Sequence, residues 1–390
     1  MSELYKLPNG WEWKNLSSIC RFINGKAYKK VELLNSGKYP VLRVGNFFTN
    51  NNWYYSDLEL PDDKYCDYGD LLYAWSASFG PKIWTGKKSI YHYHIWKLIP
   101  NYELVDKSFL YQILDWDVEQ IKLDQGTGTT MIHITKGSIE ARMVPIPPLK
   151  EQKRIVSKLD TLFKKIDKAI ELHEKNIKES DAFMGSVLNE VFEELEKKYD
   201  SKELFKIAEV NRGKSKHRPR NDKKLFGGKY PFIQTGDVRK SNKYINSYEN
   251  TYSEFGLSQS KLWKKGTICL TIAANIGDVA ILDIESCFPD SIVGIYSDDN
   301  LNDFLYYFFL TLKQHLESKA TTTAQMNINL KVLQSIGVPL PSLETQQKTV
   351  KYLDEVSLKI EKTKAIQKEK LQNLKDLKAS ILDQAFKGQL

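Results

Sequence analysis

Two sets of residues in this sequence have the types and spacing of metal-dependent active sites. Pro289-Asp290, followed by Glu317-Ser318-Lys319, resembles a nuclease signature in which carboxylates hold Mg²⁺. Glu317 falls at the tail of a predicted helix, which favours a structural role over a nuclease site. His92 and His94 lie two residues apart on a possible strand, and no third ligand follows nearby. We therefore predict no catalytic residue and no metal site.

The sequence motifs of amino-methyltransferases and of nucleotide-driven motors are also missing. An amino-methyltransferase uses an N/D-P-P-Y/F tetrapeptide, whereas Pro147-Pro148 here follows Ile146. The GxxxxGK[ST] phosphate loop of a nucleotide-driven motor does not occur either. The four cysteines (Cys20, Cys66, Cys269 and Cys287) form no C-x-x-C pair, so we expect buried, reduced thiols and no zinc site. The chain is predicted to bind no cofactor itself.

Composition describes a folded protein of several domains. The chain has 390 residues, of which 41% are hydrophobic and 27% charged. It contains no apolar run of the ~18 residues that a membrane helix needs. Its first residues, MSELYKLPNGWEWKNL, lack the features of a secretory signal. We therefore expect a cytoplasmic protein.

Positive charge is concentrated in one short segment. The net charge is +8, and residues 212–224 contain seven basic side chains against one acid, Asp222. Lys214, Lys216, Arg218 and Arg220 form the centre of this segment. Such a cluster gains affinity for nucleic acid by releasing the counterions of the phosphates. A solvated loop without a ligand is the alternative.

The chain contains an internal duplication. PIPPLKEQKRIVSKLD, starting at Pro145, and PLPSLETQQKTVKYLD, starting at Pro339, superimpose with a shift of 194 residues. Thirteen identities follow without a gap to the end of the chain, among them Gln152 with Gln346. The repeat spans half the chain, which indicates a duplicated unit instead of a solenoid.

Each repeated segment is predicted to form one long helix of about 49 residues, which is roughly 70 Å at ~1.5 Å per residue. Apolar residues recur every three or four positions, which gives a narrow stripe. In the first copy these are Ile155, Leu159, Leu162, Ile166 and Ile170, and in the second Leu353, Val356, Ile360, Leu371, Leu374, Leu377 and Ile381. The two helices would bury their stripes against each other as an antiparallel pair.

The segments before the helices are globular. They contain short apolar runs after Asp70, Thr267 and Asp278, which predict strands. Helical stretches are predicted at 107–123 and 301–316, each followed by a threonine-rich loop. Tyr39-PVLRVGN resembles Tyr230-PFIQTGD at a shift of 191 residues, so the two segments share a fold but differ in their loops.

These observations predict an α+β protein. Two globular α/β domains are separated by two long helices that pair as an antiparallel coiled coil, with pseudo-two-fold symmetry. The expected boundaries are 1–145 and 201–338 for the domains, and 146–200 and 339–390 for the helices.

The whole arrangement resembles the specificity subunits of type I restriction–modification systems. PIPPLKEQKRIVSKLD looks like the PLPEQ-type helix entry of that family, whereas the second copy departs from it at Ser342 and Thr345. The resemblance implies that each globular domain is a target-recognition domain for one half of a bipartite, asymmetric DNA site. It also implies a spacer made of the helices and two modification (methyltransferase) subunits as partners. Two restriction (motor-nuclease) subunits would complete the complex, and S-adenosylmethionine, ATP and Mg²⁺ would bind to the partner subunits.

Base discrimination uses Arg, Asn, Gln, Ser or Thr side chains on loops that reach the major groove. Besides the basic segment, the candidates in the first domain are Arg43, Asn46, Ser76, Ser78, Lys82, Thr127, Thr129 and His133. Those in the second are Gln234, Asp237, Arg239, Asn275, Thr321, Thr323 and Asn327. Trp75, Trp84 and Trp263 are candidates to pack on DNA sugars.

Two other classes of protein remain open at this point. One is a stand-alone nuclease or methyltransferase with fused reader domains, which would cut or methylate DNA by itself. The other is a structural coiled-coil protein, whose binding to DNA would not depend on sequence.

Overall fold

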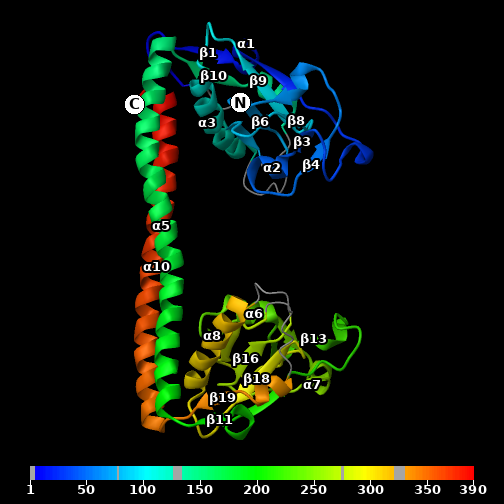
Figure 1. Ribbon diagram of the computed structural model, residues 1–390, viewed down its shortest axis with the longest axis vertical. Helices are drawn as coiled ribbons and strands as arrows, with labels where there is room; N and C mark the ends of the chain where they lie inside the picture. The colour runs from blue at the N-terminus through cyan, green and yellow to red at the C-terminus, as the bar shows by residue number, and fades with distance from the viewer. Residues whose placement is uncertain (1–4, 77–78, 126–133, 274–275, 320–329) are drawn as a thin grey trace. The chain divides into compact units, whose positions relative to one another are not determined.

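The protein divides into two compact units. Unit 1 comprises residues 1–173 with 369–390, and unit 2 comprises residues 174–368. Each contains sheets, short helices and part of both long helices, as Figure 1 shows. The computed structural model describes residues 5–76, 79–125, 134–273, 276–319 and 330–390. Among these residues, no helix combines the length and apolar character needed to cross a membrane.

The described part of unit 1 is built on two four-stranded sheets and a two-stranded pair. The first sheet has the order β2-β9-β6-β7, the second β4-β3-β8-β5, and β1 pairs with β10. The strands are β1 (Glu12–Asn15), β2 (Cys20–Asn24), β3 (Tyr39–Leu42), β4 (Tyr54–Ser56), β5 (Tyr65–Cys66), β6 (Leu71–Ala74), β7 (Gly80–Ile83), β8 (Ser89–Tyr91), β9 (Ile95–Pro100) and β10 (Met143–Ile146). The helices are α1 (Leu16–Ile19), α2 (Val44–Phe48), α3 (Lys107–Gln125) and α4 (Lys136–Glu140), with 3₁₀ turns at Lys30–Glu32 and Asp62–Lys64.

The described part of unit 2 has one more strand in its main sheet than unit 1, and two two-stranded pairs in place of the second sheet and the β1-β10 pair. The order there is β12-β18-β16-β17-β14, while β13 pairs with β15 and β11 with β19. The strands are β11 (Ser201–Glu203), β12 (Glu209–Arg212), β13 (Phe226–Phe232), β14 (Tyr244–Ile245), β15 (Asn250–Tyr252), β16 (Ile268–Thr271), β17 (Val279–Leu282), β18 (Ile292–Tyr296) and β19 (Gly337–Pro339). The helices are α6 (Thr235–Lys240), α7 (Glu254–Ser258), α8 (Asn302–Lys319) and α9 (Leu330–Gln334), with 3₁₀ turns at Leu204–Lys206 and Lys223–Leu225.

The main sheets of the two units have the same antiparallel core. β2-β9-β6-β7 corresponds strand for strand to β12-β18-β16-β17. β6, β16 and β17 lie in the apolar runs after Asp70, Thr267 and Asp278, and their side chains are buried. α3 and α8 cover the positions predicted to be helical. The sequence-based strands and helices are therefore confirmed.

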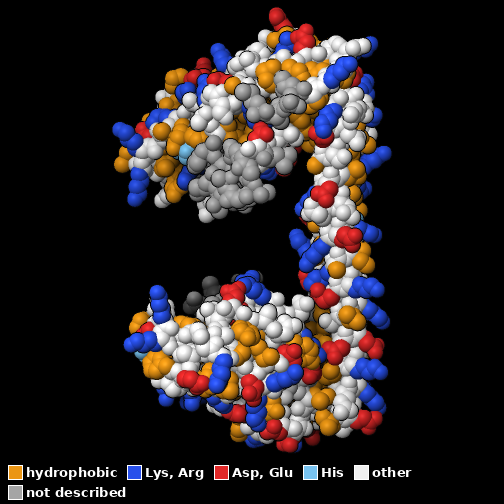
Figure 2. All heavy atoms as spheres, turned by 180° about the vertical axis from the view of Figure 1, so that it is seen from behind, with side chains coloured by type: hydrophobic (Ala, Val, Ile, Leu, Met, Phe, Trp, Pro, Cys, Tyr) orange, Lys and Arg blue, Asp and Glu red, His pale blue; other side chains and the backbone are white. Residues whose placement is uncertain are grey.

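Two long helices follow the globular segments. α5 (Leu149–Lys198) has 50 residues and α10 (Leu343–Phe386) has 44. α10 stops before Gly388, whose φ of 71° is a left-handed conformation that ends a helix. Figure 2 shows basic and acidic side chains interspersed along the visible face of the helical pair.

A buried glutamine ties the start of α5 to the globular part of unit 1. Gln152 Nε2 donates to the carbonyls of Pro147 and Leu104, both at 2.8 Å. Its Oε1 accepts from the backbone N–H of Asp106, also at 2.8 Å, directly before α3. Because Gln152 is 0% exposed, its side-chain amide has no water as an alternative partner. We call this arrangement the glutamine clamp.

Unit 2 has the same clamp at the start of α10. Gln346 Nε2 donates to the carbonyl of Pro341 at 3.1 Å and to Asn300 Oδ1 at 3.0 Å. Its Oε1 accepts from the backbone N–H of Leu301 at 3.2 Å, directly before α8. The glutamine repeated in the sequence therefore has one role in both units.

The far end of the other long helix packs on the same globular part. In unit 1, the ring of Phe386 from α10 lies 5.5 Å from the rings of both Phe109 and Trp116 on α3. In unit 2, the ring of Phe192 from α5 lies 5.4 Å from that of Phe304 on α8. Phe192 and Phe386 are among the thirteen repeated identities. Each globular part thus contacts the start of one long helix and the end of the other.

The helices pair antiparallel within each unit. Asp167 forms an ion pair with Lys378 in unit 1, and Asp181 with Lys364 in unit 2, both at 2.7 Å. The second pair lies 14 residues further along α5 and 14 residues back along α10, so the register is the same in both units. Fourteen residues are two heptads, the period of a coiled-coil stripe.

The predicted stripe is confirmed in part. Ile155, Leu159 and Leu353 are at most 1% exposed. Leu377, however, is 48% exposed, so its assignment to the stripe was wrong. Near its end, α10 instead buries Phe386, because α3 covers a different side of the helix there.

Replacing Gln152 with leucine should destabilise unit 1 by about 3 kcal/mol, because the three hydrogen bonds of this buried side chain are removed at about 1 kcal/mol each. Native-state hydrogen exchange of the α3 amides measures this locally, with the exposed Lys153→Ala as the control. Gln346→Leu should produce the same destabilisation in α8 and leave α3 unchanged. A destabilisation no larger than that of Lys153→Ala would show that the clamp contributes little.

Candidate nucleic-acid interface

The basic segment of unit 2 is a loop with a fixed backbone. It leaves β12 at Gly213, where an added Cβ would lie 2.3 Å from the carbonyl oxygen of Pro289. The backbone N–H of Lys214 donates to the carbonyl of Phe288, and that of Lys216 to the carbonyl of Gln259. The basic side chains of the loop are nevertheless exposed. The loop is therefore anchored and presents its charges to solvent.

Some of these charges already have partners. Arg220 pairs with Asp290 at 2.9 Å, and Arg218 donates to the carbonyls of Ser215 and His217. Lys214 and Lys216 form no ion pair with any acid in the described part of the chain. The charges of these two lysines, like those of the exposed Arg212, Lys223 and Lys224 in the same segment, are open to a phosphate.

The carboxylate of Asp290 forms an ion pair with Arg220. This contact is a structural role for Asp290, which the sequence also favours over a nuclease site. The side chain of Glu317 lies outside the described residues. Within the described residues, no cluster of three or more His, Cys, Asp or Glu side chains is arranged to hold a metal ion.

In unit 1, a polar pocket lies beside α2. Its volume is about 540 Å³. It is lined by Asn35, Arg43, Val44, Gly45, Asn46, Asn50, Asn52, Trp53, Tyr54, His92 and His94. We call it the α2 pocket. The guanidinium of Arg43 lies 5.2 Å from the centre of the Tyr54 ring, a cation–π contact.

The predicted reader Asn46 holds the loop of this pocket. Its Nδ2 donates to the carbonyls of Asn50 and Asn52, at 3.1 and 2.8 Å. The Asn50 side chain in turn accepts from the backbone N–H of Asn52 at 2.7 Å. Asn46 and Asn50 therefore shape the loop, whereas the side chains of Asn35 and Asn52 are exposed.

The two histidines belong to the same pocket. The backbone N–H of His94 donates to His92 Nδ1 at 3.4 Å. Burial, with the nearby His94 and Arg43, lowers the pKa of His92 to about 4. His92 is therefore neutral at pH 7, and because Nδ1 accepts a hydrogen bond, its proton is on Nε2. Sequence reasoning considered these histidines only as metal ligands and did not include them, Asn35 or Asn52 among the DNA contacts.

The corresponding region of unit 2 surrounds α6. Gln234 is exposed at the N-cap of α6, as Arg43 is at the N-cap of α2. Asp237 is 8% exposed, and its Oδ2 accepts from the backbone N–H of Gln234 at 2.8 Å. A second pocket of about 500 Å³ extends from Asp237 to Glu249. Asp237 thus stabilises the start of α6, and Arg239 is exposed on the same helix.

Several predicted readers are not exposed loop residues. Ser76 is 8% exposed, like Asp237. Lys82 lies on β7, and its Nζ donates to the carbonyl of Phe47 at 2.7 Å. Trp84 and Trp263 are 7% and 2% exposed, so the prediction that they pack on DNA was wrong. Ser78, Thr127, Thr129, His133, Asn275, Thr321, Thr323 and Asn327 lie outside the described residues.

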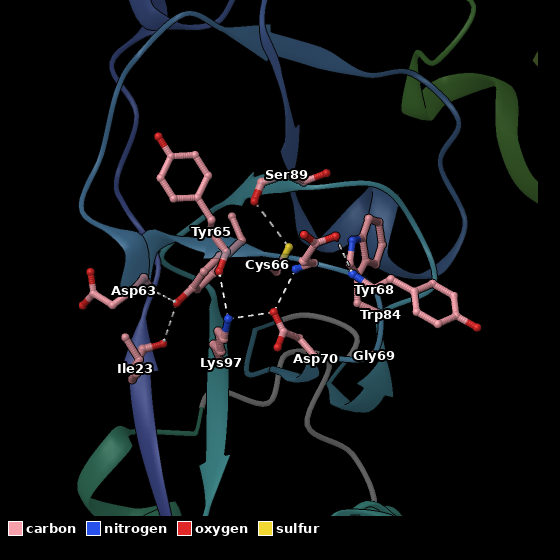
Figure 3. Close-up of polar contacts among 12 residues, drawn as sticks. Ile23, Asp63, Tyr65, Cys66, Tyr68, Gly69, Asp70, Trp84, Ser89 and Lys97 are labelled. Atoms are coloured by element: carbon pink, nitrogen blue, oxygen red, sulfur yellow. Dashed lines mark hydrogen bonds and ion pairs between the residues drawn. The ribbon is translucent and has the colours of Figure 1, made fainter.

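A polar cluster inside unit 1 is structural. Figure 3 shows Lys97 of β9 between Asp70 and the carbonyl of Tyr65, at 2.7 and 3.2 Å from its Nζ. The thiol of Cys66 lies 3.5 Å from the carbonyl of Ser89. These contacts join β5, β8 and β9 to the residue that precedes β6.

The cysteines are buried, as predicted, and none forms a disulfide. Burial raises the pKa of the Cys20 and Cys66 thiols to about 12 and that of Cys287 to about 11. Burial also raises the pKa of Cys269. Thiols with such pKa values stay protonated at neutral pH, so they are poor nucleophiles.

Comparison with known families matches most of the chain. Residues 8–179 and 196–372 match the family described as "Type I restriction modification DNA specificity domain". The Type I restriction enzyme EcoBI specificity subunit of Escherichia coli is 23% identical and aligns over 99% of this chain and 88% of its own length. The Type I restriction enzyme MjaVIII specificity subunit of Methanocaldococcus jannaschii is 24% identical over 99% of this chain and 94% of its own length.

Solved structures share the fold. A chain from a study described as "Structural basis underlying complex assembly and conformational transition of the type I R-M system" has a TM-score of 0.77, with 22% identity, and covers 99% of this chain and 100% of its own. The HsdS subunit from Thermoanaerobacter tengcongensis has a TM-score of 0.51, with 20% identity, and covers 100% of this chain and 99% of its own.

Replacing Lys214, Lys216, Arg218 and Arg220 with alanine should weaken binding to all DNA sequences alike. The plot of log affinity against log salt should flatten by about 0.9 for each phosphate that the variant no longer neutralises. The double variant Lys214→Ala, Lys216→Ala should produce the same kind of change without leaving Asp290 unpaired.

The control replaces Lys229 and Lys265, two exposed lysines of the same unit that pair with Glu254 and Asp283. Fluorescence anisotropy at several salt concentrations measures the slopes. An unchanged slope in the quadruple variant would show that the basic segment is a solvated loop.

Proposed function

This chain belongs to the type I restriction modification DNA specificity family, and on that premise we propose that it recognises a bipartite, asymmetric DNA site, one half with each unit. The duplication of the globular part carries the proposal. The two units share the order of their main strands but differ in the side chains around α2 and α6. Two domains that share a scaffold but differ in their loops would each recognise a different sequence, as a DNA site with two different halves requires.

The contacts with DNA would be of two kinds. The exposed cations of the basic segment would hold phosphates and contribute affinity without regard to sequence. The exposed polar side chains around α2 and α6 would contact base edges and determine the sequence. Arg43, Gln234 and Arg239 remain candidates for the second role, together with the predicted readers outside the described residues.

We propose that partner subunits supply the chemistry. Two modification subunits would bind S-adenosylmethionine and methylate adenine, and two restriction subunits would use ATP and Mg²⁺ to move along and cut DNA. The chain itself would catalyse no step and would scaffold these partners. The buried thiols and the ion-paired Asp290 are consistent with that role.

The purified chain alone should neither methylate nor cut DNA, because its proposed task is recognition. Incubation with labelled S-adenosylmethionine and with Mg²⁺ measures both activities. Addition of the modification subunit encoded beside it should start methylation at one bipartite sequence, mapped by long-read sequencing of the DNA. Methyl transfer or cleavage by the chain alone would instead identify a stand-alone enzyme with fused readers.

We further propose that the paired helices act as a spacer between the two half-sites. Deletion of residues 177–183 from α5 and 362–368 from α10 tests this. Both segments lie in unit 2 and consist of half-buried or exposed residues. The first contains Asp181 and the second contains its ion-pair partner Lys364. Removing seven residues from each helix keeps the heptad register and shortens the pair by about 10 Å.

The gap between the half-sites should then shrink by up to about three base pairs, at ~3.4 Å per pair, while the half-site sequences stay the same. The change is smaller if the helices lie oblique to the DNA axis. Methylome mapping gives the gap directly. Deleting 177–183 alone is the control, because it offsets the two helices by one heptad, so that the clamp and the phenylalanine contact of a unit no longer coincide, and it should abolish activity. An unchanged gap in the matched variant would contradict the spacer.

A further inference from the structure

The α2 pocket combines side chains from four separate stretches of unit 1. Asn35 precedes β3, Arg43 begins α2, Asn52 precedes β4, and His92 follows β8. The described residues that line it include no Asp or Glu, so no carboxylate there would repel DNA or neutralise Arg43. A concave polar surface without acids suits the acceptor-rich edges of bases.

Arg43 has a fixed backbone and an exposed guanidinium that can bind a ligand. Its backbone is fixed, because its carbonyl accepts from the N–H of Phe47 at 2.8 Å at the start of α2. Its side chain is exposed and lies over the Tyr54 ring. Among the described residues it forms no ion pair. The ring of Tyr54 would restrain the arginine stem, which lowers the entropy cost of binding.

The neighbours of Arg43 are also suited to base edges. The proton on Nε2 of neutral His92 makes it a hydrogen-bond donor, and Asn52 has an exposed amide on a loop that Asn46 and Asn50 hold in place. An ordered loop around an arginine provides the fixed geometry that bidentate recognition needs.

We propose that Arg43 recognises a guanine in the half-site read by unit 1, through bidentate hydrogen bonds to O6 and N7. This inference rests on the proposed DNA-reading function and names one of its contacts. Guanine is the base that presents two acceptors in the spacing of the guanidinium fork. A lysine would keep the charge but not the fork.

Unit 2 has a different side chain at the matching position. Gln234 follows β13 as Arg43 follows β3, and it lies at the N-cap of α6. Its side chain takes part in the capping box of α6, and its Oε1 also has a long contact from Asn250 Nδ2 at 3.4 Å. A glutamine side-chain amide can accept a hydrogen bond from N6 of adenine and donate one to N7. The same position would therefore select different bases in the two half-sites.

The test uses the full chain co-expressed with the modification subunit encoded beside it, with methylome mapping of wild type, Arg43→Ala and Arg43→Lys. In Arg43→Ala, the preference for guanine at one position of one half-site should fall about 5- to 150-fold. Arg43→Lys should also lose much of this preference. The other half-site should stay unchanged in both variants.

Two controls separate the inference from its alternatives. Arg21→Ala, at an exposed arginine of β2 outside the pocket, should leave both half-sites unchanged. Gln234→Ala should relax one position in the half-site that Arg43 does not affect. The thermal unfolding midpoint of each variant checks that the chain stays folded.

A uniform loss of methylation with unchanged half-sites in Arg43→Ala would overturn the inference, because Arg43 would then bind a phosphate. Wild-type specificity in Arg43→Lys would overturn it as well. Either result would leave the bipartite site of the wild type intact. The absence of any sequence-specific methylation in the wild-type complex would instead overturn the proposed function, and this inference with it.

Discussion

The two globular parts are held to the long helices by the same pair of contacts, and the rest of the structure depends on them. The glutamine clamp joins the start of one helix to the backbone just before α3 or α8. The phenylalanine near the end of the other helix packs on that same α3 or α8. Because each clamp contains three hydrogen bonds to one buried glutamine, it has a defined geometry that a surface contact would not provide.

This arrangement separates the residues that hold each unit from those that would read DNA. The glutamine of the clamp and its proline partner repeat at a shift of 194, and they are identical in the two copies. The positions at the start of α2 and α6 repeat at a shift of 191 and differ, with arginine in one and glutamine in the other. The exposed side chains around α2 and α6 can change without disturbing the buried clamps, since the buried Phe47 and Val238 of these helices belong to hydrophobic clusters separate from those of α3 and α8.

The sequence predicted the duplication, the long helices and the main strands, because these depend on periodic apolar patterns over many residues. It did not predict that Asp237 caps its own helix or that Ser76 is buried, since both depend on the path of the backbone in three dimensions. It also missed the α2 pocket, whose Asn35 and His92 are 57 residues apart in the sequence. Leu377 fits the stripe by spacing alone but is exposed.

The central claim is that each unit reads its own half-site on a shared helical frame. Replacing residues 201–339 with a second copy of residues 12–146 tests it most directly, because α3 would then offer Gln346 and Phe192 the surface that α8 offers them now. We predict that the resulting complex methylates a site made of two copies of the first half-site, as mapped by long-read sequencing. Retention of the original asymmetric site would contradict the account.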